Sequence, residues 1–137
     1  MKDKKNYAIL NFNKIFDERG NLTFLESENQ IPFKIKRVYW IYDVPGGEVR
    51  GGHGYKKLEE VIIALSGSFD VELSFGGTKK KTINLNRSYK GLYIPGMTWR
   101  QLKQFSTNSV ALILASSPYD PEDYIYDFKE FENLKNV

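Results

Sequence analysis

Residues 60–85, EVIIALSGSFDVELSFGGTKKKTINL, decide the fold class, because they contain three short strand patterns separated by two turn signals. The run Val61–Leu65 is apolar, rich in β-branched residues and too short for a typical helix. Residues 69–75 alternate strictly between apolar and polar, which is typical of a strand with one buried face. Gly76-Gly77 then predicts a two-residue hairpin loop, because such loops need positive φ. The stretch therefore predicts consecutive antiparallel strands.

The same pattern of short strands and turns continues on both sides of this stretch. Earlier strands are expected over residues 7–12, 22–26 and 35–42, and later ones over residues 91–94, 98–102 and 109–115. Residues 120–123 have the composition of a helix start, so residues 124–134 are expected to form a short C-terminal helix. Short strands that recur about every 8–12 residues predict an all-β sandwich or barrel. We expect residues 1–137 to form a single domain of this kind.

Composition limits the classes of function. The chain has 137 residues, 41% of them hydrophobic, and no cysteine, which excludes disulfides, thiolate metal sites and cysteine nucleophiles. No apolar run approaches 18 residues, and the first residues lack the apolar part of a signal peptide, so a cytoplasmic protein without a membrane partner is expected. The net charge of +3 suits an anionic ligand such as a nucleotide, and it is too dispersed to argue for nucleic-acid binding.

The chain has one histidine, His53, inside the stretch Arg50-Gly51-Gly52-His53-Gly54-Tyr55. Histidine is the side chain best suited to proton transfer near neutral pH. A lone histidine is also a common structural residue, so the neighbouring residues are needed to decide between a catalytic and a structural role. Arginine, tyrosine, lysine and carboxylate side chains all occur within seven residues of His53, and the glycines allow close approach of the backbone to a ligand. His53 is therefore the first candidate for a catalytic base.

Two spacings in the chain resemble the two motifs of the cupin superfamily of jelly-roll barrels. The first spacing comprises Gly47, His53, Tyr55, Glu59 or Glu60, and Gly67, and the second comprises Gly91, Pro95-Gly96, Arg100 and Asn108. Metal-binding cupins carry histidines where this chain has Tyr55 and Arg100. A guanidinium has only hydrogen-bond donors and a positive charge, so it cannot ligate a cation. We therefore expect a cupin-type jelly roll without a metal or any other cofactor.

The chain more closely resembles the metal-free cupin 3,4-ketoisomerases of dTDP-4-oxo-6-deoxyhexoses. The resemblance implies a homodimer of jelly rolls, often with exchanged N-terminal strands. It also implies conversion of dTDP-4-oxo-6-deoxy-D-glucose into a 3-oxo sugar, for 3-amino-3,6-dideoxy sugars of bacterial surface glycans such as the lipopolysaccharide O-antigen. The segments that carry the resemblance run in order along nearly the whole chain: Arg19-Gly20-x-Leu22, residues 35–43, Arg50-Gly51-x-His53-x-x-Lys56-Lys57-Leu58, Gly91-Leu92-Tyr93, Trp99, and Ala115-Ser116-x-x-Tyr119-Asp120-x-x-Asp123-Tyr124-Ile125.

The resemblance also assigns roles to residues. It implies that His53 is the base that moves the proton, while Tyr55 stands where the family usually has a second histidine. Either His53 carries out both proton transfers, or Tyr55 or a water molecule shares the work. Arg50 is the nearest cation for the diphosphate or an oxyanion, and Arg100 is expected to influence which face of C4 receives the proton. Further candidates for substrate contacts are Arg19, Arg37, Tyr39, Tyr42, Lys57 and Trp99. Trp40 and Trp99 are either core residues or nucleobase platforms. Glu59 and Glu60 are expected either to be structural or to orient His53 through a hydrogen bond.

Three other functions remain open at this point. A cupin that kept the dTDP-sugar pocket and lost turnover would fit the missing second histidine. A dTDP-sugar 3,5-epimerase would normally use a histidine together with a catalytic aspartate and tyrosine, and such a set cannot be placed in this sequence. A barrel that serves only oligomerisation, without a ligand, is the third alternative.

Overall fold

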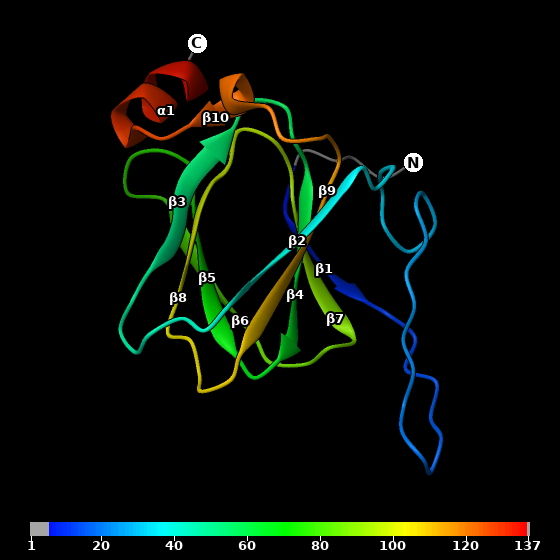
Figure 1. Ribbon diagram of the computed structural model, residues 1–137. Helices are drawn as coiled ribbons and strands as arrows, with labels where there is room; N and C mark the ends of the chain where they lie inside the picture. Colours follow the sequence, from blue (N-terminus) through cyan, green and yellow to red (C-terminus); the bar gives the residue numbers. More distant parts are fainter. Residues whose placement is uncertain (1–5, 137) are drawn as a thin grey trace.

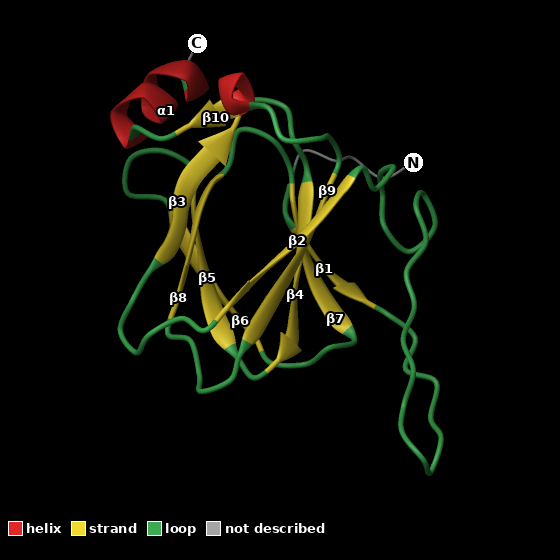
Figure 2. Cartoon of the chain, in the orientation of Figure 1, coloured by secondary structure: helices red, strands yellow, loops and turns green. Residues whose placement is uncertain are grey.

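The computed structural model describes residues 6–136, which form two five-stranded antiparallel sheets that face each other (Figure 1). The first sheet has the order β1 (Ala8–Asn11), β7 (Lys90–Ile94), β4 (Glu60–Ser66), β9 (Val110–Ala115) and β2 (Arg37–Tyr42). The second sheet has the order β10 (Tyr124–Ile125), β3 (Arg50–Tyr55), β8 (Trp99–Lys103), β5 (Phe69–Ser74) and β6 (Lys80–Leu85). A 3₁₀ turn (Pro121–Asp123) and helix α1 (Phe128–Lys135) lie at one end of the second sheet (Figure 2). The expected all-β architecture with a short C-terminal helix is confirmed.

The space between the sheets holds the main hydrophobic core. The alternation in β5 directs Phe69, Val71 and Leu73 into this core, where all three are fully buried. The apolar run of β4 is buried for a different reason, because both of its faces are covered. Its Ile62 faces the core between the sheets, whereas Ile63 packs against an N-terminal segment on the outer face, in a cluster that includes Phe12, Ile31 and Phe33. An apolar run without alternation is what a strand covered on both sides requires.

The expected strand over residues 22–26 is absent, and this prediction was wrong. Leu22 forms only an isolated bridge with Ile15 across the turn at residues 18–19. Residues 13–30, called the arm below, extend away from the sheets (Figure 1). A strand needs a neighbour to satisfy its backbone N–H and C=O groups, and within residues 6–136 the stretch 22–26 pairs with another extended segment only at Leu22. The alternating pattern of residues 22–26 is therefore not sufficient for a strand within one chain.

The C-terminal segment also differs from the expectation of a helix over residues 124–134. Tyr124 and Ile125 pair with Tyr55 and Gly54 of β3, and the helix begins only at Phe128. Asp127 caps it, because its side chain accepts a hydrogen bond from the Lys129 backbone N–H. The earlier aspartate, Asp120, caps the separate 3₁₀ turn. The two acidic caps thus divide the segment into a short strand and a helix.

The expected hairpin between β5 and β6 is present, with one residue more in its loop. Gly76 and Gly77 have φ of 102° and 60°, as a tight turn demands. The Phe75 N–H donates to the Lys79 carbonyl at 3.0 Å, so Thr78 also belongs to the loop. Within residues 6–136, neither helical segment has the length and apolarity needed to cross a membrane.

Candidate active site

A bulge in β3 sets the direction of His53. Arg50 pairs with Leu102 and His53 pairs with Arg100, so β3 advances three residues while β8 advances two. Gly51 lies in this bulge with φ of 70°, and a Cβ there would come within 2.1 Å of the Arg100 Nη1 atom. Only glycine fits both the conformation and the space. The bulge thereby brings His53 directly across from Arg100.

Arg100 is the centre of a buried polar network. Its side chain is 1% exposed, its Nε lies 2.6 Å from Glu60 Oε1, and its Nη2 lies 3.1 Å from Glu60 Oε2. Nη2 also donates to the Tyr39 hydroxyl at 3.0 Å, and Nη1 donates to the Gly51 carbonyl at 3.0 Å. Burial alone would lower the pKa of Arg100, but the Glu60 carboxylate outweighs it and raises the pKa, so the guanidinium stays charged. Protein atoms therefore hold Arg100 on all sides of its planar group.

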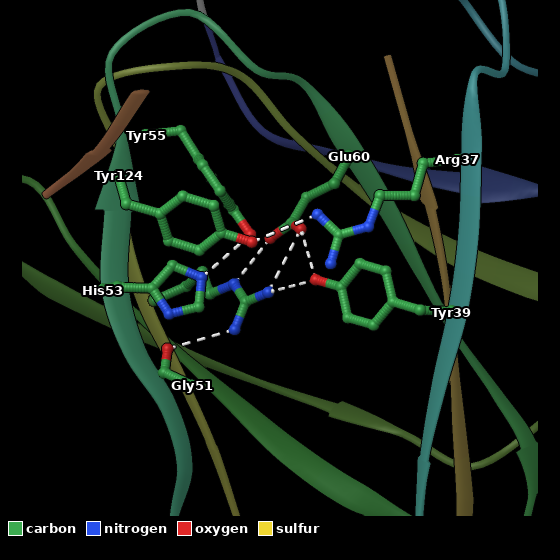
Figure 3. A network of polar contacts seen from close by, with 8 residues as sticks. Arg37, Tyr39, Gly51, His53, Tyr55, Glu60 and Tyr124 are labelled. Carbon is green, nitrogen blue, oxygen red and sulfur yellow. Dashed lines mark hydrogen bonds and ion pairs between the residues drawn. The ribbon is translucent and has the colours of Figure 1, made fainter. Parts of the chain in front are cut away.

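This network favours the structural alternative for Glu60 over the orienting one. Its carboxylate binds Arg100 and accepts a hydrogen bond from the Tyr39 hydroxyl at 3.4 Å, and it does not bind His53. The imidazole instead lies with Nε2 2.9 Å from the hydroxyl of Tyr55, two residues further along the same strand (Figure 3). Side chains at positions i and i+2 of a strand share a face, which explains why these two meet.

The protonation states in this group follow from its burial and charge. Burial lowers the pKa of His53 to about 3, and the positive charges of Arg100 and Arg37 add to the shift. Burial raises the pKa of Tyr39 to about 12, and the nearby Glu60 carboxylate acts in the same direction. Burial and Glu60 likewise raise the pKa of Tyr55. At neutral pH the site therefore holds an uncharged imidazole and two protonated phenols.

A rim of tyrosines borders His53. The Tyr124 and Tyr126 rings lie 5.1 Å and 6.0 Å from the imidazole, and they stack on each other at 5.2 Å. Arg37, from β2 of the opposite sheet, donates to the Tyr124 hydroxyl at 3.1 Å and lies 5.3 Å from the Tyr119 ring. Tyr119 and Tyr126 are 60% and 63% exposed, so this side of His53 is in contact with solvent. Figure 3 shows Arg37 and Tyr39 facing His53, Tyr55 and Tyr124 across the gap between the sheets.

A neutral imidazole beside two arginines and an aromatic rim suits proton transfer on an anionic substrate. The family model described as "FdtA: WxcM-like, C-terminal" matches residues 5–136. The chain belongs to this family. A relative from Aneurinibacillus thermoaerophilus, TDP-4-oxo-6-deoxy-α-D-glucose-3,4-oxoisomerase, is 43% identical over 127 residues, which cover 93% of this chain and 88% of the relative.

Solved structures of the ketoisomerase family agree with this assignment. A 3,4-ketoisomerase from Helicobacter canadensis is 42% identical, with a TM-score of 0.93 over 96% of this chain and 98% of its own. A histidine-to-asparagine mutant of the 3,4-ketoisomerase QdtA from Thermoanaerobacterium thermosaccharolyticum, solved in complex with TDP-4-keto-6-deoxyglucose, is 39% identical, with a TM-score of 0.93 over 96% of this chain and 95% of its own. The resemblance inferred from the sequence is confirmed, and the protein is an isomerase of this family.

The epimerase alternative has only distant support. A dTDP-4-dehydrorhamnose 3,5-epimerase from Bacillus anthracis is 12% identical with a TM-score of 0.76, over 90% of this chain and 79% of its own. At this identity the likeness concerns the fold alone.

The structure brings five of the candidate residues together: His53, Tyr55, Arg37, Tyr39 and Arg100. Tyr119, Tyr124 and Tyr126 were not predicted to be site residues, because Tyr124 and Tyr126 lie in the expected helix and Tyr119 lies just before its start. The sequence nevertheless contained an indication of their role, since Tyr119 and Tyr124 belong to the tail motif shared with the family.

Two aromatic candidates lie on other faces of the sheets. Tyr42 is on the outer face of β2 and is 59% exposed, on the side of the strand opposite to Tyr39. Trp99 directly precedes Arg100, so it points to the other side of β8, where its ring meets Phe128 of α1 at 5.3 Å. Alternation along a strand therefore removes both from the surroundings of His53.

Three cationic candidates lie outside the network. Arg50 is exposed at the start of β3, and Lys57 is exposed in the turn after it, close enough to the tail for its backbone N–H to donate to Asp123. Arg19 lies in the arm, where its side chain is 91% exposed and pairs with Asp17.

The donor set does not suit a metal ion. Within residues 6–136, no three His, Cys, Asp or Glu side chains gather in one place. Both carboxylate oxygens of Glu60 are already bound by Arg100, a cation that supplies no lone pair.

Proposed function

We propose that this ketoisomerase converts dTDP-4-oxo-6-deoxy-D-glucose into a dTDP-3-oxo-6-deoxyhexose, with His53 as the group that moves the proton. The observation that supports this best is the position of the chain's one imidazole, which is uncharged and lies among Arg37, Arg100 and the tyrosine rim. The substrate is the one named for the Aneurinibacillus relative and bound by the QdtA mutant.

The reaction needs no external oxidant. His53 takes the proton from C3, which the C4 ketone acidifies, and the electron pair of that C–H bond forms the C3=C4 bond of an enediolate. The negative charge collects on the oxygen at C4, where the positive potential of Arg37 and Arg100 stabilises it. The C3 hydroxyl passes its proton to the adjacent oxygen at C4, the imidazolium returns the abstracted proton to C4, and the electrons of the C3=C4 bond form the new C4–H bond, which leaves a ketone at C3 and a hydroxyl at C4. An approaching diphosphate opposes the charges of the two arginines and so raises the pKa of His53 towards the range of an effective base.

The decisive test is an NMR time course of the 4-oxo sugar nucleotide in D₂O, with wild type and His53→Asn side by side. We expect the wild type to produce a 3-oxo sugar with deuterium at C4, and the variant to retain dTDP binding without turnover. Wild type that binds dTDP without turnover would leave the non-catalytic binding protein, and deuterium at C5 would indicate an epimerase. An unaltered melting temperature in dTDP would favour the oligomerisation barrel. A parallel reaction in H₂O leaves hydrogen at C4, and the H4–H5 coupling constant of that product reports whether it is gluco or galacto.

We also propose that the protein is a homodimer that exchanges its N-terminal segments. The outer face of the first sheet exposes an apolar patch formed by Val38, Trp40, Tyr42 and Leu65, each 49–59% exposed. Two hollows of about 780 and 590 Å³ lie beside this patch, and the arm lines the first of them. Apolar surface of this kind is typical of a subunit interface. A second copy would cover it and give the arm a neighbouring strand.

Sedimentation velocity tests the dimer, with Trp40→Glu as the variant and Tyr119→Phe as a surface control. A monomeric mass for the wild type contradicts the proposal. In a dimer with exchanged N-terminal segments, Arg19 would lie against the partner subunit. It therefore remains a candidate for a contact with the substrate. The cytoplasmic location, the single domain over residues 1–137 and the role in O-antigen synthesis stay predictions.

A further inference from the structure

The two ring nitrogens of His53 have different surroundings. Nε2 is 2.9 Å from the Tyr55 hydroxyl, which is the one hydrogen bond that the imidazole ring makes among the described residues. No buried side-chain nitrogen or oxygen in residues 6–136 lacks a hydrogen-bond partner. Because Nδ1 has no partner there, it cannot be buried, and it is the ring nitrogen in contact with solvent. A substrate can therefore reach His53 only through Nδ1.

A neutral imidazole carries one proton, so its tautomer decides whether it can act as a base. If Tyr55 donated to Nε2, the proton would sit on Nδ1, and the accessible nitrogen would have no lone pair to offer. If Nε2–H donates to the Tyr55 oxygen, Nδ1 is free to accept a proton. A catalytic His53 requires the second arrangement.

The surroundings of Tyr55 permit that arrangement, because other tyrosine hydroxyls lie nearby. Tyr55 is 3% exposed, its ring packs against that of Tyr124 at 4.6 Å, and it influences the pKa of the neighbouring Tyr39 hydroxyl. The Tyr39 hydroxyl donates in turn to the Glu60 carboxylate at 3.4 Å. A carboxylate held by Arg100 can only accept hydrogen bonds. Glu60 thereby fixes the direction in which the Tyr39 hydroxyl donates, and His53 Nε2–H can donate to the Tyr55 oxygen.

We propose that Tyr55 is a positioning residue that holds His53 in the Nε2–H tautomer, so that Nδ1 is the atom that accepts the C3 proton. Tyr55 itself is too deeply buried to touch the sugar. The choice of Nδ1 as the base rests on the proposed function, whereas the tautomer of the resting protein is a property of the network alone.

The experiment is ¹⁵N NMR of the resting protein with histidine-selective labelling, because a single histidine gives one unambiguous pair of ring signals. We expect the wild type to show a protonated Nε2 and an unprotonated Nδ1 at neutral pH. Tyr55→Phe should lose this preference and lower kcat about 10- to 100-fold with little change in KM, as is typical when the partner that orients a histidine is removed.

The matched control is Tyr93→Phe, which removes the hydroxyl of another buried tyrosine. Tyr93 is also 3% exposed, and its hydroxyl binds Glu59 on the outer side of the first sheet. This control should change neither the tautomer nor kcat. A wild-type imidazole protonated on Nδ1 would overturn the proposal, whether or not the Tyr55 variant folds, and so would an unchanged tautomer and kcat in Tyr55→Phe. Wild type with the expected tautomer but no turnover would instead count against the proposed function alone.

Discussion

The buried network and the arm each contain an arginine paired with a carboxylate, and the two pairs have similar geometry in opposite surroundings. Arg100 Nε lies 2.6 Å from Glu60, with both side chains 1% exposed, and Arg19 Nε lies 2.9 Å from Asp17, with the side chains 91% and 42% exposed. Water screens the pair in the arm, whereas the pair in the core has lost its hydration and depends on its partner. Burial, rather than the distance between the charged atoms, determines how much each ion pair affects the free energy of unfolding.

The largest expected effect follows from neutralising the buried carboxylate. Glu60→Gln leaves the Arg100 charge uncompensated in the core, which should lower the free energy of unfolding by about 3–5 kcal/mol. Urea denaturation measures this loss. Glu72→Gln serves as the matched control, because Glu72 binds Lys103 at the same 2.6 Å with side chains 15% and 29% exposed. Equal losses of unfolding free energy in the two variants would show that burial does not determine the contribution of these ion pairs.

Gly51→Ala should have the next largest effect. The added Cβ clashes with the Arg100 Nη1 atom, and φ of 70° is unfavourable for alanine, so we expect a loss of about 2–4 kcal/mol. Gly20→Ala in the arm shares a positive φ, 139°, and meets no atom within 4 Å, so it should cost about 1 kcal/mol. Melting temperatures of the two variants separate the clash from the backbone strain. If Gly20→Ala were as damaging as Gly51→Ala, the tight contact with Arg100 would not matter.

The third prediction uses pH. His53 has a folded-state pKa of about 3 against an ordinary 6.5, so between these values the unfolded chain binds the proton and the folded chain does not. The contribution of His53 to stability is thus complete above pH 6.5 and declines as the pH falls towards 3. Between pH 7 and pH 4.5 we expect His53 to account for about 1–2 kcal/mol of lost stability, after allowance for its contact with solvent. His53→Gln should reduce the pH dependence by that amount in urea titrations at the two pH values. An identical pH dependence in variant and wild type would show that the imidazole titrates normally.

Asp17→Asn should have the smallest effect. Water screens an exposed ion pair, so the free energy of unfolding should change little, and 1 M NaCl should remove most of the difference. Urea denaturation at low and high salt makes the comparison. A loss as large as that of Glu60→Gln would mean that the arm is covered in solution, as an exchanged dimer requires.

The strands of the sheets could be predicted largely from the sequence, because alternation and turn residues act locally. The arm and the tail could not be predicted. The alternating pattern of residues 22–26 does not reveal whether a neighbouring strand is available to pair with it. In the tail, the sequence around the two capping aspartates is equally compatible with one continuous helix. Alternation also carried information about the site. Within an expected strand over residues 35–42, alternation puts Arg37 and Tyr39 on the face opposite to Tyr42, and it likewise separates Trp99 from Arg100. The bulge at Gly51 and the partner of Glu60 depend on contacts between distant segments, which no local pattern contains.

The tyrosine rim has a practical consequence for protein engineering. Tyr119 and Tyr126 reach the surroundings of His53 from a tail that contributes no residue to the Arg100–Glu60 pair. A library that varies these two exposed positions can alter which sugars the enzyme accepts, while the buried charges that support the fold stay in place.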